Sequence, residues 1–306
     1  VEDTDTIIKN REDTASSNIV TIDAENDKVE VKLDNVNIKA DSGSALTSKG
    51  DVTLALNGDN HLTGGISGTG NYGRNGIAST GSLTISGGEN DSLTAQGGSG
   101  ADGSYGGHGI YSNGSLTISG GTVNATGGDG SNVNGSGISS NGSVTISGGT
   151  VNATGGNGSH GGNGIYSRSS LTISGGTVNA AGGDGGNGKD GGYGIISNDI
   201  DLSGSLELTA KAGSPNGKAL SQKGSELELD TIKDTLGPGA KVTVTDANGK
   251  VNQVSIPRPV EPEEPVIPGE SSSSSDGGSA TPSAPASFLP GLTVTDKDGQ
   301  RISYTS

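Results

Sequence analysis

The chain has 306 residues, of which 58 are glycine and none is cysteine, and its formal net charge is −16. Apolar residues make up only 27% of it, too few for an ordinary globular core, and no apolar run is long enough for membrane insertion. The lack of cysteine excludes a disulfide framework, and the negative charge makes nucleic acid an unfavourable partner.

The first predicted elements lie near the N-terminus. Residues 1–17 are polar and without periodicity, so we expect a flexible lead-in. Apolar and polar residues then alternate between 18 and 40, with one slip at Asp34 and Asn35, which predicts a strand, a turn and a second strand. A second unit of this kind begins at Gly50.

A repeated phrase follows, close to LTISGGTVNATGG in each copy. The copies begin at Gly81, Gly114, Gly142 and Ser169. A phrase that recurs at a nearly fixed period indicates one structural unit that is stacked on itself. A Gly-Ile pair precedes each copy and occurs once more after the last, at spacings of 27 to 33 residues: Ile77, Ile110, Ile138, Ile165 and Ile195.

Within one copy, the pattern predicts short strands with a single apolar face. Leu116 and Ile118 alternate with polar residues, as do Val123 and Ala125, so these four side chains should point inward. The Gly-Gly and Asn-Gly steps between strands would supply the positive-φ bends of sharp corners. Such a unit needs only a thin core that is shared between neighbours.

We therefore predict an all-β chain with a single-stranded parallel β-helix of about seven coils over residues 18–235 and three short strands per coil. Residues 236–256 should form a hairpin that caps the open end of the stack. Residues 257–287 are rich in proline and serine and indicate a linker. Residues 288–306 repeat the TVTD text of the hairpin, and form a short strand segment or begin a further module.

The variable loops after each copy are the first candidate site. Two of them begin like the calcium-binding GGxGxD pattern, although true repeats of that pattern recur every nine residues. Carboxylate and amide oxygens are the ligands that Ca²⁺ prefers. Simple corner turns built on Asp-Gly and Asn-Gly remain the alternative. The candidate metal ligands are Asp102, Asp129, Asn157, Asp184 and Asp190.

The tyrosines are the second candidate site. Tyr111 and Tyr166 each follow an inward isoleucine and should point outward, and Tyr72 and Tyr105 each precede their isoleucine by five residues. Exposed aromatic rings often mark binding sites, whereas rings that cover thin loops have only a structural role. The candidate ligand-binding residues are Tyr72, Tyr105, Tyr111, Tyr166 and Tyr193.

A third candidate is the outward row of threonine and asparagine in the TVNAT segments, which would bind a polymer or simply form hydrogen-bonded ladders along the stack. Catalysis is not expected. Glycoside hydrolysis requires two carboxylates at working distance, which no coil offers, and the histidines His61, His108 and His160 do not have the spacing of metal ligands.

The segments from Asp27 to Leu46 and from Gly50 to Gly65, together with the repeated coils, resemble a known family. It is the carbohydrate-binding β-helix domain of surface and secreted proteins in anaerobic Gram-positive bacteria, of which clostridial cellulose- and pectate-binding proteins are representatives. The resemblance covers roughly residues 18–232. It implies a right-handed β-helix, calcium sites and non-catalytic binding of acidic plant polysaccharide.

From the residues and this resemblance we expect a secreted or cell-surface protein that binds polysaccharide, such as polygalacturonate or cellulose. We expect it to bind with the help of Ca²⁺ and without cleaving the polymer. The first residue is valine, which is consistent with a processed product. The alternative is a structural stalk or adhesin repeat that spaces other domains, in keeping with the linker that follows. The sequence does not indicate an oligomeric state.

Overall fold

The computed structural model describes residues 6–11, 14–67, 72–100 and 104–259. All of them belong to the first of two compact units, Val1–Val260. The predicted linker beyond residue 259 and the predicted segment 288–306 lie outside the described residues. No helix among the described residues is long and apolar enough to cross a membrane.

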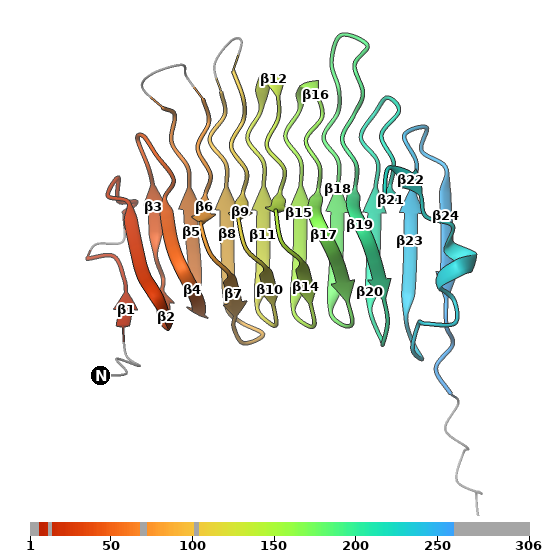
Figure 1. Ribbon diagram of the computed structural model, residues 1–306, viewed down its shortest axis with the longest axis horizontal. Coiled ribbons are helices and arrows are strands. Elements are labelled where there is room, and N and C mark those ends of the chain that lie inside the picture. The colour runs from red at the N-terminus through yellow and green to blue at the C-terminus, as the bar shows by residue number, and fades with distance from the viewer. Residues whose placement is uncertain (1–5, 12–13, 68–71, 101–103, 260–306) are drawn as a thin grey trace, which may run out of the picture. The chain divides into compact units, whose positions relative to one another are not determined.

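The unit is a parallel β-helix, or solenoid, of about seven coils, as the repeat predicted. Each coil passes through three strand positions, and Figure 1 shows the strands of successive coils side by side. Strands at the first position are β6 (Ile77–Ser79), β9 (Ile110–Ser112), β13 (Ile138–Ser140) and β21 (Leu220–Gln222). Strands at the second position are β7 (Leu83–Ser86), β10 (Leu116–Ile118) and β14 (Val144–Ile146). Four longer strands span both positions: β2 (Val20–Asp34), β4 (Leu46–Asn57), β17 (Ile165–Ile173) and β19 (Ile195–Leu202).

The eight third-position strands and β24 (Val251–Ser255) form a separate sheet of nine, while the strands of the first two positions, with β1 (Thr6–Ile8) and β22 (Ser225–Glu226), form a sheet of thirteen. The third-position strands are β3 (Asn37–Lys39), β5 (Asp59–Thr63), β8 (Ser92–Gln96), β11 (Thr122–Thr126), β15 (Thr150–Thr154), β18 (Thr177–Ala181), β20 (Glu207–Lys211) and β23 (Lys241–Thr245). The remaining elements are β12 (Gly130–Val133), β16 (Gly158–His160) and the 3₁₀ helix η1 (Leu229–Ile232).

The copies of the repeat stack in register. Ile110 pairs with Ile77 on one side and Ile138 on the other, and Val123 pairs with Val151. These inward side chains are fully buried, as alternation predicted. Because parallel strands lie about 4.8 Å apart, each apolar residue packs on its own copies, and a few per coil make a continuous core.

A row of serines also points inward, which the sequence analysis did not predict. Each is the third residue of the first strand position. Ser112 Oγ donates to the carbonyl oxygens of Gly81 and Gly114 at 3.0 and 3.1 Å, and Ser140 Oγ donates to Gly114 at 2.9 Å. These hydroxyls add hydrogen bonds to corner carbonyls of their own and the neighbouring coil, whereas Ser48 Oγ is buried without a partner among the described residues. The row consists of Ser48, Ser79, Ser112, Ser140, Ser167 and Ser197, all buried.

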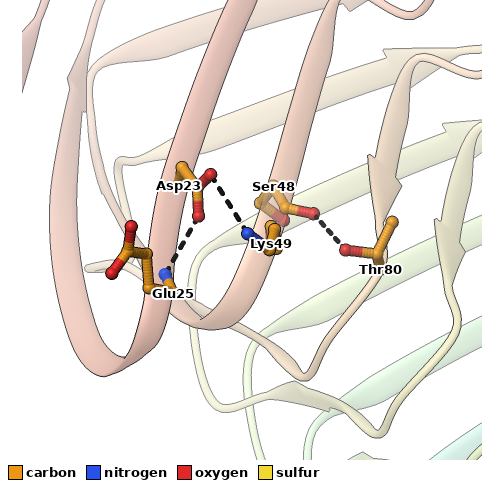
Figure 2. A network of polar contacts seen from close by, with 5 residues as sticks. All are labelled: Asp23, Glu25, Ser48, Lys49 and Thr80. Atoms are coloured by element: carbon orange, nitrogen blue, oxygen red, sulfur yellow. Dashed lines mark hydrogen bonds and ion pairs between the residues drawn. The ribbon is translucent and has the colours of Figure 1, made fainter.

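Figure 2 shows this corner at the N-terminal end of the stack. Thr80 Oγ1 donates to the Ser48 carbonyl at 3.3 Å, and Lys49 Nζ lies 3.3 Å from Asp23 Oδ2. The N–H of Glu25 donates to Asp23 Oδ1 at 3.0 Å and lowers the pKa of that carboxyl. Both members of the ion pair are exposed, so it contributes little to stability.

Glycine has two separate roles in the coil. Gly121 and Gly149, each the second glycine of an SGG corner, have φ values of 75° and 76°, as expected for a sharp turn. The Gly-Gly pairs that follow the third strand position do not have positive φ. Our prediction that they also supply such bends is wrong, because their role is close packing of two backbones.

The second glycine of each of these pairs and a glycine on the returning part of the same loop form a file of backbone hydrogen bonds along the stack, here called the glycine file. Gly107 N–H donates to the carbonyl of Gly98 at 2.9 Å, Gly128 donates to Gly107 at 2.7 Å, and Gly135 donates to Gly128 at 3.0 Å. A Cβ on Gly135 would lie 1.7 Å from the Gly107 carbonyl oxygen. No larger residue fits. Through the described coils the file continues with Gly156, Gly162, Gly183, Gly192, Gly213 and Gly217.

Both ends of the stack carry additional strands. β24 pairs antiparallel with β23 and forms the expected hairpin, with a turn in which Asp246 Oδ1 accepts the N–H groups of Asn248 and Lys250, each at 2.9 Å. β22 pairs antiparallel with β21. At the other end, β1 pairs with β2 in parallel and Ser16 bridges to Ile38. Residues 6–8 are thus a strand rather than part of a flexible lead-in, because β2 offers them a free edge.

Candidate functional site

The copies of the repeat differ most in the loops that connect the third strand position to the next first position. Figure 1 shows these loops together along one edge of the stack, on the side of β12 and β16. In each loop an outgoing and a returning leg meet at the glycine file. We call them the rim loops: 64–76, 97–109, 127–137, 155–164, 182–194 and 212–219, of which 68–71 and 101–103 are not described.

In three successive rim loops, the residue after the Gly-Gly pair holds the outgoing legs together. Asp129 Oδ1 accepts the N–H of Asn157 at 2.7 Å, and Asn157 Oδ1 accepts the N–H of Asp184 at 2.7 Å. Asp184 Oδ1 accepts the N–H of Ser214 at 2.8 Å. Three of the predicted metal ligands thus stand in one column, one coil apart, and each uses one oxygen to join successive coils.

The other predicted metal ligands are not in this column. Asp190 lies on a returning leg, where its Oδ1 accepts a hydrogen bond from Asn216 Nδ2 at 3.0 Å. Asp102 lies outside the described residues. Within the described ranges, no three histidine or acidic side chains are grouped so as to hold a metal ion. Binding of Ca²⁺ by these loops stays a prediction.

A second column runs along the returning legs and is exposed. Tyr72 and Tyr105 have exposed fractions of 42% and 44%, and their ring centroids are 5.5 Å apart with the planes tilted by 37°. Val133 continues the column with an exposed fraction of 45%, and its carbonyl accepts the N–H of Gly106 at 3.0 Å. His160 pairs with Val133 in the next coil and is also exposed.

We call these four residues the rim stripe: Tyr72, Tyr105, Val133 and His160. The two tyrosines were predicted from the sequence and Val133 and His160 were not, although all four precede the isoleucine of their coil by five residues. That offset was the available signal. Exposed apolar side chains on adjacent rungs form one continuous surface, and such surfaces mark interaction sites.

The other three predicted ligand-binding tyrosines are half-buried: Tyr111 and Tyr166 lie in the wall of the coil, and Tyr193 lies at the end of rim loop 182–194. Tyr111 follows inward Ile110, its hydroxyl accepts a hydrogen bond from Asn141 Nδ2 at 2.8 Å, and its ring stacks on His108 at a centroid distance of 5.8 Å. Tyr166 occupies the same position two coils further on. Tyr193 donates its N–H to Asn163 Oδ1 at 2.9 Å. The structure does not bring these three together with Tyr72 and Tyr105.

His108 also has a place in the stack. Its Nδ1 accepts the N–H of Ser136 at 2.9 Å, and its own N–H donates to Asn75 Oδ1 at 2.8 Å. Asn163 accepts the N–H of Tyr193 at the corresponding position. Histidine thus fills the position of a ladder asparagine here. Burial lowers the pKa of His108 from 6.5 to about 4, so the ring is neutral at physiological pH.

This environment predicts a pH dependence of stability. Because the unfolded chain binds a proton at His108 below pH 6.5 and the folded chain does not until about pH 4, stability from this residue is complete above 6.5 and is lost as the pH falls toward 4. The unfolding free energy should fall by about 2 kcal/mol over this range. This is less than the whole pKa difference would give, since the side chain is only half-buried and water screens part of the effect.

His108→Asn should still accept the N–H of Ser136, just as Asn75 accepts the N–H of His108 and Asn163 that of Tyr193. Because asparagine does not titrate, the variant should lose this pH dependence. The measurement is urea denaturation of both proteins at several pH values between 4 and 7.5. A difference between the two unfolding free energies that stays constant over this range would contradict the assignment.

The outward row of the third position is a ladder of amides. Asn152 Nδ2 donates to Asn124 Oδ1 at 2.8 Å, and Asn179 Nδ2 donates to Asn152 Oδ1 at 2.9 Å. The alternative of hydrogen bonding along the stack is confirmed. Asn124 and Asn152 are part-buried and Asn179 is exposed. The three amides bond to one another, so this face has fewer free polar groups for a ligand than its composition indicates.

A shallow groove of about 410 Å³ lies among the three rim loops 127–137, 155–164 and 182–194. It is lined by polar side chains and glycine backbone, including Ser131, Asn157, Ser159, Asp184 and Asn187. The rim therefore changes character along the stack, from aromatic and apolar at Tyr72 and Tyr105 to polar and acidic at Asp184 and Asp190.

Comparison with known proteins agrees with this architecture. A protein-family model described as a beta helix repeat matches residues 116–142, 144–163 and 171–195, which are the central coils. Searches of curated proteins and of solved structures found no match. The fold and the repeat match together show that the described unit is a parallel β-helix.

Proposed function

We propose that this β-helix binds polysaccharide without cleaving it, and that the rim stripe is the contact surface. The observation that carries the proposal is the pair Tyr72 and Tyr105. Both rings are more than two-fifths exposed, stand on adjacent coils and lie 5.5 Å apart. Aromatic rings stack on the apolar faces of sugars, and rings fixed to a rigid scaffold do so at a low entropy cost.

The stripe runs along the axis of the stack, so a polymer would contact it over several coils. Each coil advances by about 4.8 Å, and the stripe spans four coils from Tyr72 to His160. A long, open surface of this kind suits an extended chain better than a small molecule, which prefers a concave pocket.

Charge bears on which polysaccharide is bound. The chain has a net charge of −16, Asp129 lies on the same rim loop as Val133, and Asp184 and Asp190 lie on the rim beyond the stripe. An acidic glycan such as polygalacturonate would be repelled unless Ca²⁺ bridged its carboxylates to those of the rim. We therefore propose calcium assistance for acidic glycans, whereas a neutral glycan such as cellulose would not need it.

The absence of catalysis is part of the proposal. His108, the histidine closest to the stripe tyrosines in sequence, uses its Nδ1 to accept a backbone N–H. Asp129 and Asp184 each use an oxygen in the same way. Glycoside cleavage needs one carboxyl group to donate a proton and a second one positioned across the bond, and these roles conflict with groups that hold the coils together.

The experiment is calorimetric titration of the protein with soluble polygalacturonate, cello-oligosaccharides and mucin glycans, with and without millimolar Ca²⁺. Tyr72→Ala/Tyr105→Ala should weaken binding by about tenfold or more, since each lost stacking contact is worth about 0.5–1.5 kcal/mol. Tyr166→Ala is the matched control, because this ring lies in the wall outside the stripe. If no glycan binds under either condition, the proposal is wrong.

A calcium contribution has its own test. Asp129→Ala/Asp184→Ala should reduce any Ca²⁺-dependent increase in melting temperature and leave the stripe intact. If the wild-type protein and the variant both melt at the same temperature with and without Ca²⁺, the proposed calcium site is wrong. The proposal of binding to a neutral glycan would then still stand.

The second candidate function is a secreted or cell-surface stalk that spaces other domains. The specific observation in its favour is the proline-rich, acidic text PRPVEPEEPVIPGE from Pro257, followed by a run of five serines. A stalk needs no ligand, so the same titration separates the two functions.

A further inference from the structure

The chain contains ten Asn-Gly steps, which are the dipeptides most prone to spontaneous loss of the asparagine amide. In this reaction the backbone nitrogen of the glycine attacks Cγ of the asparagine side chain. Both partners must be free to move, because a nitrogen whose hydrogen is held in a bond is a poor nucleophile. The ten asparagines are Asn57, Asn75, Asn113, Asn134, Asn141, Asn157, Asn163, Asn187, Asn216 and Asn248.

The stack protects most of these steps through the glycine nitrogen. Gly76 N–H donates to His108, Gly114 to Gly81, and Gly135 to Gly128, all at backbone carbonyls between 3.0 and 3.1 Å. The glycines that follow Asn57, Asn157, Asn163, Asn216 and Asn248 also donate. Across the described parts of the chain, this leaves Gly142 and Gly188 as the post-asparagine glycines whose N–H has no acceptor.

The side chains separate these two sites. Asn141 donates to both the Tyr111 hydroxyl and Asn113 Oδ1, at 2.8 and 2.9 Å, so its amide is held in place. Asn187 is exposed, and its side chain has no partner within the described residues. A Cβ placed on Gly188 would meet nothing within 4 Å, so the space around the reacting nitrogen is open.

The backbone around Asn187 is also less constrained than that around Asn141. Asn187 and Gly188 have φ values of 53° and 72°, and Lys189 N–H donates to the Gly186 carbonyl at 3.0 Å. They are the two central residues of a tight turn at the tip of the rim loop 182–194. The tip is tied to the stack only through its legs, so it opens without disturbing the coils.

We propose that Asn187 is a modification site of this protein, where the side-chain amide is lost spontaneously in the folded state. The Gly188 nitrogen forms a bond to Asn187 Cγ and the Cγ–Nδ2 bond breaks, so that Nδ2 leaves as ammonia with the amide proton. Water then opens the five-membered ring and leaves aspartate or isoaspartate. Nothing is oxidised or reduced.

The modification would change the rim. Asn187 lines the groove together with Asn157 and Asp184, and the new carboxylate adds a negative charge to a loop that already holds Asp184 and Asp190. The rim stripe, on earlier coils, is not altered. The inference is independent of the proposed function, because it concerns bond chemistry in the folded loop.

The test is peptide mapping by mass spectrometry after incubation of the folded protein at mildly alkaline pH and 37 °C. Asn187 should convert at a rate about tenfold or more above every other Asn-Gly step, because the others first require local opening. In urea, where the stack is unfolded, the ten steps should convert at similar rates.

Asn187→Gln is the control, since the longer side chain would have to form a six-membered ring and the main product should disappear. Two results would overturn the proposal. One is a folded protein in which another Asn-Gly step converts as fast as Asn187. The other is an Asn187 amide that persists in the folded chain while urea exposes it to rapid conversion.

Discussion

Gly135→Ala should lower the free energy of unfolding by about 3 kcal/mol or more. The added methyl group would lie 1.7 Å from the Gly107 carbonyl oxygen and 2.5 Å from its carbonyl carbon. Both atoms belong to backbone that is bonded on each side along the glycine file, so neither has room to retreat. Ordinary overpacking costs about 1–3 kcal/mol, and a clash of backbone with backbone should exceed that range.

The matched control is Gly88→Ala, in the turn between the second and third strand positions. A Cβ there would meet the side-chain Oδ2 of Asp91 at 3.1 Å, and Gly88 does not have positive φ. This change should stay within about 1 kcal/mol of the parent. Urea denaturation followed by circular dichroism measures both. Equal losses for the two variants would show that the file is not a packing constraint.

Ile138→Ala should destabilise the stack by about 3–4 kcal/mol. Ile138 is fully buried and packs between Ile110 and Ile165 of the neighbouring coils. Truncation of a buried isoleucine removes its transfer free energy and leaves a cavity. In a solenoid each coil is held only by its two neighbours, so the cavity weakens both interfaces at once.

Thr126→Ala is the control for this core change. Thr126 is exposed at the end of β11, on the outward side of the same stack, and its loss should cost within about 0.5 kcal/mol. The unfolding midpoints in urea measure the difference. If Ile138→Ala unfolds at the same midpoint as Thr126→Ala, the thin core does not hold the coils together.

Much of the fold could be predicted because the same residues recur in register. Period-two alternation within LTISGGTVNATGG is local information, and it correctly places Leu116, Ile118, Val123 and Ala125 in the core. The stacking follows from repetition alone. The inward serines, such as Ser112, were not predicted, because serine is by residue type a surface residue and its hydrogen-bond acceptors here include a carbonyl of the neighbouring coil.

Glycine illustrates a second limit. Composition and turn chemistry suggest positive φ for every Gly-Gly step, and this holds at Gly121 but not at Gly128. The reason for glycine at Gly128 is the Gly98 carbonyl oxygen, 2.1 Å from where its Cβ would be. Approach between two chain segments thirty residues apart has no local signature in the sequence.

The candidate site was predicted in part. Asp129, Asn157 and Asp184 do share one column, but their hydrogen bonds to the next coil show a structural role that residue types alone do not reveal. Tyr72 and Tyr105 were identified from a shared offset to the Gly-Ile pair, and the structure confirms that they are exposed neighbours. Val133 has the same offset but was not predicted, because the offset was applied only to aromatic residues and an exposed valine in a loop is not by type a binding residue.

The central claim is that residues common to all coils build the stack, while the variable rim binds. The most direct test compares the affinity for the best-bound glycan of a rim variant, Tyr72→Ala/Tyr105→Ala, with that of a face variant, Asn124→Ala/Asn152→Ala. We predict that the rim variant loses at least about tenfold in affinity and that the face variant binds like the parent. Loss of binding in the face variant with full affinity in the rim variant would contradict the claim.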